Sequence, residues 1–292
     1  MKIHRSGRLA VLPLLLLTSA ACGQQEVGGA GDAGSPERSY SADTVVFRMD
    51  HVGGFLTPAM LATRLPAVSV YGDGRVITEG PVTLVYPGPA LPNLQVRTIS
   101  AEEVESLVAQ ARAAGVGGGA DLGTPPVADA ASTRFTLLGD KGVEESEVYA
   151  LGEATGTDSG LNADQQTARD KLRAFAESLT APSGPLGDTL GDTAAYAPTA
   201  VAAVGEPWVA DRQVGEQPEV AWPGPALPGT ALSKNLGLGC VTVTGDEVRT
   251  LLGAAASANA ATPWTSDGKQ WKVTLRPLLP EESDCGDLAN KR

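Results

Sequence analysis

Short runs in which apolar and polar residues alternate predict β-strands in the first half of the chain. The runs lie at 44–52, 67–71, 75–79, 82–86, 94–99, 133–138 and 143–151. In the first run, Val45, Phe47 and Met49 fall on one face. The pair Asp73-Gly74 separates the second run from the third, and Asp-Gly favours a hairpin because the turn needs positive φ. The last two runs predict a second hairpin.

Two stretches with helical spacing of apolar residues follow these strands. The first helix is expected to begin after Ser100 as N-cap, with Glu103 completing a capping box. It is expected to end at Gly115, because glycine readily adopts the left-handed conformation of a helix C-cap. The second helix is predicted at 162–179.

The hexapeptide Pro-Gly-Pro-Ala-Leu-Pro occurs twice, at 87–92 and at 223–228. Downstream of both copies, a similar set of residues would cap a helix, with Thr244 as N-cap and Glu247 as its partner in the second copy. A loop and a predicted strand come next in each case. We therefore expect an internal duplication of a strand-helix-strand unit.

The first 21 residues have the composition of a secretory signal. Lys2, Arg5 and Arg8 precede an apolar stretch at 9–17 that is too short to span a bilayer. The small residues before Cys22 resemble the lipobox of bacterial lipoproteins. That resemblance implies cleavage before Cys22 and a diacylglycerol on its thiol, whose two acyl chains give a stable anchor. Cleavage that releases a soluble secreted protein is the alternative.

The rest of the chain divides by composition into four parts. Cys22 and a flexible tether occupy 22–43, a first α+β unit 44–180, a linker 181–195 and a second, shorter α+β unit 196–292. The expected fold class is α+β, with antiparallel hairpins and sheets packed against amphipathic helices.

With Cys22 lipidated, Cys240 and Cys285 remain as a pair. In an oxidising compartment outside the cytoplasm such a pair is expected to form a disulfide. Two free thiols are the alternative.

The formal net charge is −12. Removal of the signal takes away three basic residues and no acidic one, so the charge becomes −15. A chain this acidic is repelled by nucleic acid and by an anionic membrane surface. We therefore expect no nucleic-acid partner, and membrane attachment only through Cys22.

The sequence contains no phosphate loop, dinucleotide fingerprint, zinc-protease motif or nucleophile elbow. Ser266 and Lys269 have the S-x-x-K spacing, but the intervening Asp267-Gly268 favours a hairpin turn. His51 is the sole histidine after the signal, so any Ser-His-Asp triad would have to use it. We expect His51 to be packed or at a strand end, and no catalytic residue is assigned.

Clusters of acidic residues are interpreted mainly as solvated surfaces, as first turns of helices and as charged edge strands that discourage aggregation. They lie at 102–103, 144–147, 188–192 and 281–284. None has the spacing of a calcium loop, so no metal site and no cofactor is assigned; a weak divalent site is the alternative. The repeated hexapeptide contains PxxP, which polyproline ligands use. Its recurrence favours a rigid structural connection instead.

Several of these features together resemble a family of actinobacterial lipoproteins and secreted proteins that has no assigned activity. The residues that carry the resemblance are Cys22, 71–76, the helix from Ser100, 133–136 and 149–152. The resemblance implies localisation on the outer face of the cytoplasmic membrane and an α+β domain. We expect a non-catalytic binding module with an envelope protein as partner; the alternative is an envelope hydrolase or accessory enzyme with a carboxylate or serine site.

Overall fold

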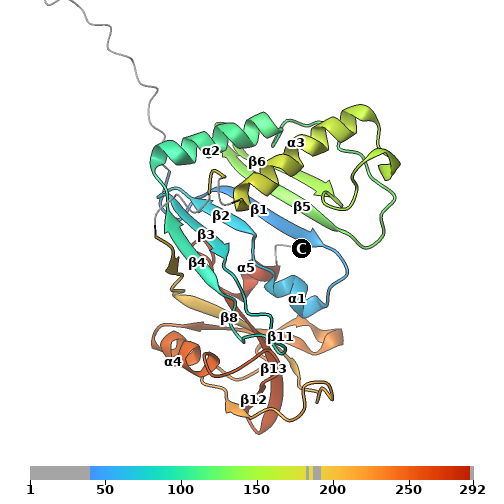
Figure 1. The fold of residues 1–292 in the computed structure, drawn as a ribbon. Helices are drawn as coiled ribbons and strands as arrows, with labels where there is room; N and C mark the ends of the chain where they lie inside the picture. Colours follow the sequence, from blue (N-terminus) through green and yellow to red (C-terminus); the bar gives the residue numbers. More distant parts are fainter. Residues whose placement is uncertain (1–39, 182–183, 187–191, 290–292) are drawn as a thin grey trace, which may run out of the picture. The chain divides into compact units, whose positions relative to one another are not determined.

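A computed structural model describes residues 40–181, 184–186 and 192–289. These residues all belong to one compact unit, Arg38–Arg292. They form an α+β fold built on two β-sheets (Figure 1). The expected signal at 1–21, Cys22, most of the tether and part of the linker lie outside the described residues.

The first sheet is antiparallel throughout, with the strand order β6-β5-β1-β2-β3-β4-β7. Both predicted hairpins are confirmed: Asp73-Gly74 joins β2 to β3, with φ of 84° at Gly74, and β5 pairs with β6. The last strand comes from the predicted linker. The strands are β1 (Val45–Gly53), β2 (Val68–Tyr71), β3 (Arg75–Glu79), β4 (Leu94–Thr98), β5 (Ala131–Gly139), β6 (Gly142–Tyr149) and β7 (Ala194–Ala195).

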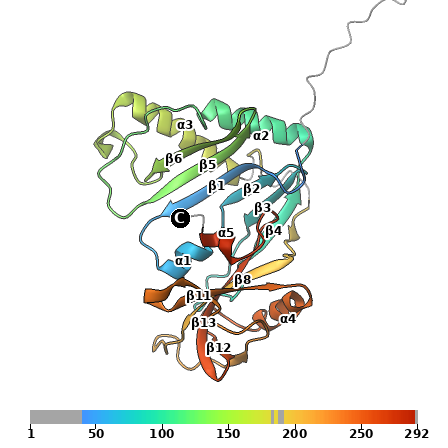
Figure 2. The same cartoon turned by 180° about the vertical axis from the view of Figure 1, so that it is seen from behind.

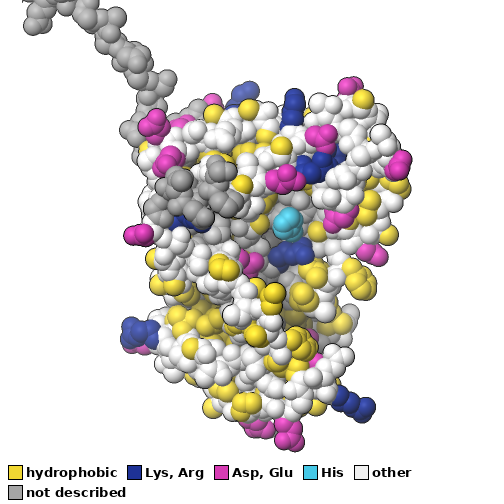
Figure 3. All heavy atoms as spheres, in the orientation of Figure 1, with side chains coloured by type: hydrophobic (Ala, Val, Ile, Leu, Met, Phe, Trp, Pro, Cys, Tyr) yellow, Lys and Arg dark blue, Asp and Glu magenta, His cyan; other side chains and the backbone are white. Residues whose placement is uncertain are grey.

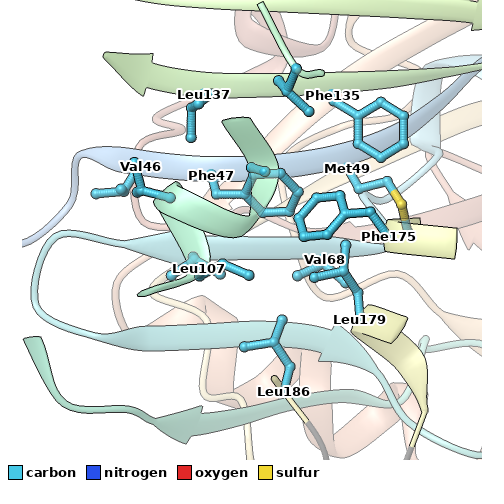
Figure 4. Packing of buried hydrophobic residues seen from close by; sticks show 14 of the residues in the cluster. Val46, Phe47, Met49, Val68, Leu107, Phe135, Leu137, Phe175, Leu179 and Leu186 are labelled. Carbon is cyan, nitrogen blue, oxygen red and sulfur yellow. The ribbon is translucent and has the colours of Figure 1, made fainter. Parts of the chain in front are cut away.

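Helices α2 (Ala101–Ala114) and α3 (Ala163–Thr180) cover one face of the first sheet (Figure 1). The predicted capping box is confirmed: the Glu103 amide donates to Ser100 Oγ at 3.2 Å, and the Ser100 amide donates to Glu103 Oε2 at 2.6 Å. Gly115 ends α2 in the left-handed conformation. In the core beneath, the rings of Phe47 and Phe175 meet edge to face with centroids 5.5 Å apart (Figure 4).

One residue of β1 departs from the predicted alternation. Phe47 and Met49 face this core, but Val45 packs with Tyr71 on the opposite side of the sheet. The pairing with β2 shifts between Val45 and Phe47, which is a β-bulge. The extra residue reverses the direction of the side chains before it.

The second sheet has the strand order β10-β11-β8-β13-β12-β9 and is antiparallel except where β9 meets β12. Its central strand, β8, was not predicted, because its Ala-Val-Ala-Ala-Val sequence has neither alternation nor strong β-propensity. The strands are β8 (Ala200–Pro207), β9 (Val220–Ala221), β10 (Thr230–Ser233), β11 (Leu238–Thr244), β12 (Pro263–Ser266) and β13 (Lys269–Pro277).

Helix α4 (Asp246–Ala255) packs with Trp222 and Trp264 over one face of this sheet. The predicted capping box at its start is wrong: the N-cap is Gly245, and no side chain caps the helix. Gly245 has φ of 62°, so a glycine turn replaces the Thr244 cap.

The two sheets are not shown to be duplicates. The hairpin after α2 joins β1 through its first strand, β5, whereas the hairpin after α4 joins β8 through its second strand, β13. The repeated hexapeptides do meet, however. Ala90 and Leu91 from the first copy and Leu227 from the second pack in the same Trp-containing core, which gives both copies the expected structural role.

A C-terminal segment at 278–288, which we call the strap, runs between the two sheets (Figure 2). Its Leu279 packs against Tyr71 and Ile77 of the first sheet. Its Leu278 carbonyl accepts a hydrogen bond from the Tyr196 hydroxyl at 2.9 Å, and burial raises the pKa of Tyr196 to about 12. Helices α1 (Pro58–Thr63) and α5 (Cys285–Ala289) lie side by side here.

Two neighbouring glutamates of the strap pair with different sheets. Glu281 bonds to Arg48 of β1 and accepts from the Tyr71 hydroxyl at 2.8 Å. Burial would lower the pKa of Arg48, but the charges of Glu281 and Tyr71 together with the hydrogen bond to Glu281 outweigh it, so that the pKa is raised. Glu282 pairs with Arg276 of β13, and both of these side chains are almost fully buried.

The predicted disulfide is present between Cys240 in β11 and Cys285 at the start of α5, with the Cα atoms 6.1 Å apart. The Thr242 hydroxyl accepts from the Cys285 amide at 3.1 Å. The disulfide therefore fixes the C-terminal part of the strap to the second sheet.

Removal of the disulfide by Cys240→Ala with Cys285→Ala is expected to lower the free energy of unfolding by about 3 to 4 kcal/mol. The reason is that the bond closes a sequence separation of 45 residues in the unfolded chain. Urea denaturation with and without reductant measures the loss. An equal stability of the reduced and oxidised forms would contradict the expectation.

Glu282→Ala is expected to lower the free energy of unfolding by about 3 to 5 kcal/mol, because it leaves the Arg276 charge buried without its partner. The double variant Arg276→Met with Glu282→Leu should lose less. Arg249→Ala is the control, since the Arg249–Asp246 pair is almost wholly exposed and should leave the urea midpoint nearly unchanged. Equal losses for Glu282→Ala and Arg249→Ala would refute this role.

Candidate functional site

A cleft with a volume of about 390 Å³ lies where the segment between β3 and β4 reaches the second sheet. The segment contributes Tyr86 and Pro87. The end of β8 and the loop after it contribute Glu206, Trp208 and Asp211. We call this site the Tyr86–Trp208 cleft. It was not predicted, because its two walls are far apart in the sequence.

Charged groups in the cleft are each bonded to another side chain. The Tyr86 hydroxyl donates to Asp211 Oδ2 at 3.2 Å, and this bond raises the pKa of Tyr86. Lys272 Nζ lies 2.8 Å from Glu206 Oε1. Trp208 donates from its indole to the Ala261 carbonyl at 3.4 Å. Asp211 therefore connects the two walls through Tyr86, and both carboxylates remain accessible to solvent.

The repeated hexapeptide positions the first wall. The Ala260 amide donates to the Gly88 carbonyl at 2.8 Å, and Pro89 bridges to Asn259. Because Ala90 and Leu91 are anchored in the second core, Tyr86 just before them is held at the end of β8.

Next to the cleft, residues 82–86 form an apolar segment that is exposed throughout. Leu84 is fully exposed, and Val82, Val85 and Tyr86 are each more than half exposed. A strand was predicted here, and this prediction is wrong: the segment belongs to no sheet among the described residues. Its backbone amides also make no backbone hydrogen bond within the described ranges.

On the face shown in Figure 3, hydrophobic side chains gather in the region where Figure 1 places β8 and α4. Val209, in the wall of the cleft, is 78% exposed and extends the apolar surface. Several exposed apolar side chains at neighbouring positions, as at 82–86, are typical of interaction surfaces in folded proteins.

His51 lies in β1 opposite Thr133 and is exposed, so the expectation of a packed side chain is wrong, although its place toward the strand end is as expected. Partial burial of the ring and the charge of Arg64 lower the pKa of His51. Arg64 is held by the carbonyls of His51 and Gly53, each at 3.0 Å. No hydrogen bond from a serine to this ring is present within the described part of the chain.

The Ser266-x-x-Lys269 spacing falls on the β12–β13 hairpin, as expected. Ser266 is buried, and its hydroxyl accepts from the Leu227 amide at 3.2 Å. The side chain therefore connects the second hexapeptide to β12 and does not form a nucleophile–lysine pair on a helix.

Three of the four acidic clusters contain residues with structural partners, and most of the fourth, at 188–192, lies outside the described residues. Glu103 caps α2, Glu147 pairs with Arg134 across the β5–β6 hairpin, and Glu281 and Glu282 belong to the strap. Among the described residues, no group of three or more His, Cys, Asp or Glu side chains could hold a metal ion. No helix in the same residues is long and apolar enough to cross a membrane.

The chain matches no protein family, no curated protein and no solved structure. The resemblance to actinobacterial lipoproteins, carried by Cys22, therefore stays a prediction.

The pKa of His51 is expected to lie below 6.5, and Arg64→Gln should raise it because the variant removes a nearby positive charge. Since folding favours the neutral ring, the free energy of unfolding should fall as the pH drops below about 6.5 and the ring becomes protonated. NMR titration of the ring, assigned with His51→Gln, measures the pKa. A value of 6.5 or more would be the contrary result.

Proposed function

We propose that this protein is a non-catalytic binding module of the cell envelope, held on the outer face of the cytoplasmic membrane by lipidated Cys22. The observation that carries the binding role is the exposed apolar segment 82–86 beside the Tyr86–Trp208 cleft. Exposed apolar area of this extent costs solvation free energy, which a partner recovers by covering it.

The cleft supports binding better than hydrolysis. General acid–base catalysis by two carboxylates relies on burial or mutual repulsion to separate their pKa values. Here Asp211 is exposed and bonded to Tyr86, and Glu206 is about one-third exposed and paired with Lys272. Ser266 and His51 are bonded or placed elsewhere, so neither the carboxylate nor the serine form of the enzyme alternative has its residues assembled in this cleft.

The proposal of a lipid anchor is based on the sequence before residue 40. The basic start, the short apolar stretch and the small residues before Cys22 are those of a lipoprotein signal. Intact-mass measurement of the protein from the membrane fraction should give a chain that starts at Cys22 and carries acyl chains. An unmodified Cys22 in that fraction would overturn the anchor while leaving the binding role open.

A photo-crosslinking amino acid at Val85 is expected to form an adduct with a partner in living cells. The same amino acid at Val143 is the matched control, because Val143 is 66% exposed and Val85 61% exposed, and Val143 lies on β6, at the far edge of the first sheet. Gel electrophoresis and mass spectrometry identify the adduct. Equal adducts at both positions, or none at Val85, would contradict a specific binding face.

A further inference from the structure

The loop that forms one wall of the cleft is acidic. Between 206 and 219 it carries four carboxylates against one arginine. Within the cleft, Lys272 offsets Glu206. Asp211 accepts from the Tyr86 hydroxyl and from the Gln213 amide, and both of these donors are neutral. The site therefore presents a net negative potential, as does the whole chain.

Two aromatic side chains stand beside this charge. Tyr86 is 73% exposed, and the indole of Trp208 is only partly buried. Aromatic faces near a carboxylate form a favourable site for an ammonium or guanidinium group, because the ring quadrupole and the carboxylate both attract a cation. The cleft volume of about 390 Å³ accommodates such a side chain.

The neighbouring segment indicates the shape of the ligand. Residues 82–86 run between Pro81 and Pro87 with exposed side chains, and their backbone amides have no backbone partner within the described residues. An extended peptide laid along such a segment gains main-chain hydrogen bonds and contacts with alternate side chains.

We propose that the Tyr86–Trp208 cleft and segment 82–86 bind an extended peptide segment of a partner protein, in which apolar residues flank a lysine or arginine. The basic side chain enters the cleft between the two aromatic residues and pairs with Asp211. The flanking apolar residues contact Val82, Leu84 and Val85. This inference rests on the proposed binding function and specifies its partner by chemistry.

Other ligand classes fit the same residues less well. An anionic ligand would meet the charge of Asp211, and a neutral sugar would cover that carboxylate without supplying a counter-charge. A purely apolar ligand would use Leu84 but leave the acidic wall unmatched. Charge complementarity therefore selects the basic peptide.

The test uses the purified full chain and a fluorescent, end-capped nonapeptide of alternating threonine and valine with a central lysine. Matched peptides carry glutamine or glutamate at the centre. Fluorescence anisotropy should show at least fivefold tighter binding of the lysine peptide than of the glutamine peptide, with no binding of the glutamate peptide. The preference should shrink as sodium chloride rises from 50 to 500 mM.

Variants of the protein locate the site. Asp211→Asn should weaken lysine-peptide binding about five- to tenfold and remove the preference over glutamine. Asp246→Asn is the matched control, because Asp246 is also an exposed carboxylate of the second sheet's unit with one side-chain partner. Tyr86→Phe keeps the ring and should retain binding, whereas Tyr86→Leu should weaken it.

Each contrary result would overturn a different part of the proposal. Equal affinities for lysine and glutamine peptides, or an unchanged affinity in Asp211→Asn, would overturn the cationic ligand and leave the binding face standing. Failure of all three peptides to bind would overturn the extended-peptide ligand. The proposed binding function is judged separately by the Val85 and Val143 crosslinks.

Discussion

Two adjacent carboxylates on the strap turn toward opposite sheets. Glu281 meets Arg48 and the Tyr71 hydroxyl, and Glu282 meets Arg276. Buried or half-buried charges are stable only when they are paired and hydrogen-bonded. Neither glutamate can leave its sheet without leaving an arginine uncompensated, so the strap defines how the first sheet meets the second. The Cys240–Cys285 disulfide holds the end of the strap in the same place.

This constraint extends to the candidate site. The Tyr86–Trp208 cleft has one wall from each side of the junction, and the Ala260–Gly88 hydrogen bond connects them. The first Pro-Gly-Pro-Ala-Leu-Pro segment reaches the second core through Ala90 and Leu91. The chain between β3 and β4 is therefore fixed by β3 at one end and by Ala90 and Leu91 at the other. Its apolar residues 82–86 lie exposed on the surface and belong to neither sheet.

The sequence was informative where structure depends on local chemistry. The Ser100 capping box and the Asp73-Gly74 hairpin follow from residue type and spacing. The disulfide follows from the two cysteines that remain once Cys22 is assigned to the lipid. The sequence was misleading where the structure of a segment depends on which other segments of the chain pack beside it. Residues 82–86 have the composition of a strand but no neighbouring strand, whereas the alanine-rich β8 lacks a strand pattern and lies at the centre of the second sheet. The cleft itself could not be predicted, because only tertiary packing brings Tyr86 near Trp208.

If the strap sets the geometry of the cleft, loosening the strap should be detectable by amide hydrogen exchange at Ala260. Glu281→Gln removes the charge that pairs with Arg48 in the first sheet, whereas Ala260 lies between α4 and β12 of the second unit. We expect faster exchange of the Ala260 amide in Glu281→Gln, because the junction that supports its bond to Gly88 is loosened. In Asp246→Asn the rate should stay unchanged. An unchanged rate at Ala260 in Glu281→Gln, with faster exchange confined to β1 and β2, would contradict the claim.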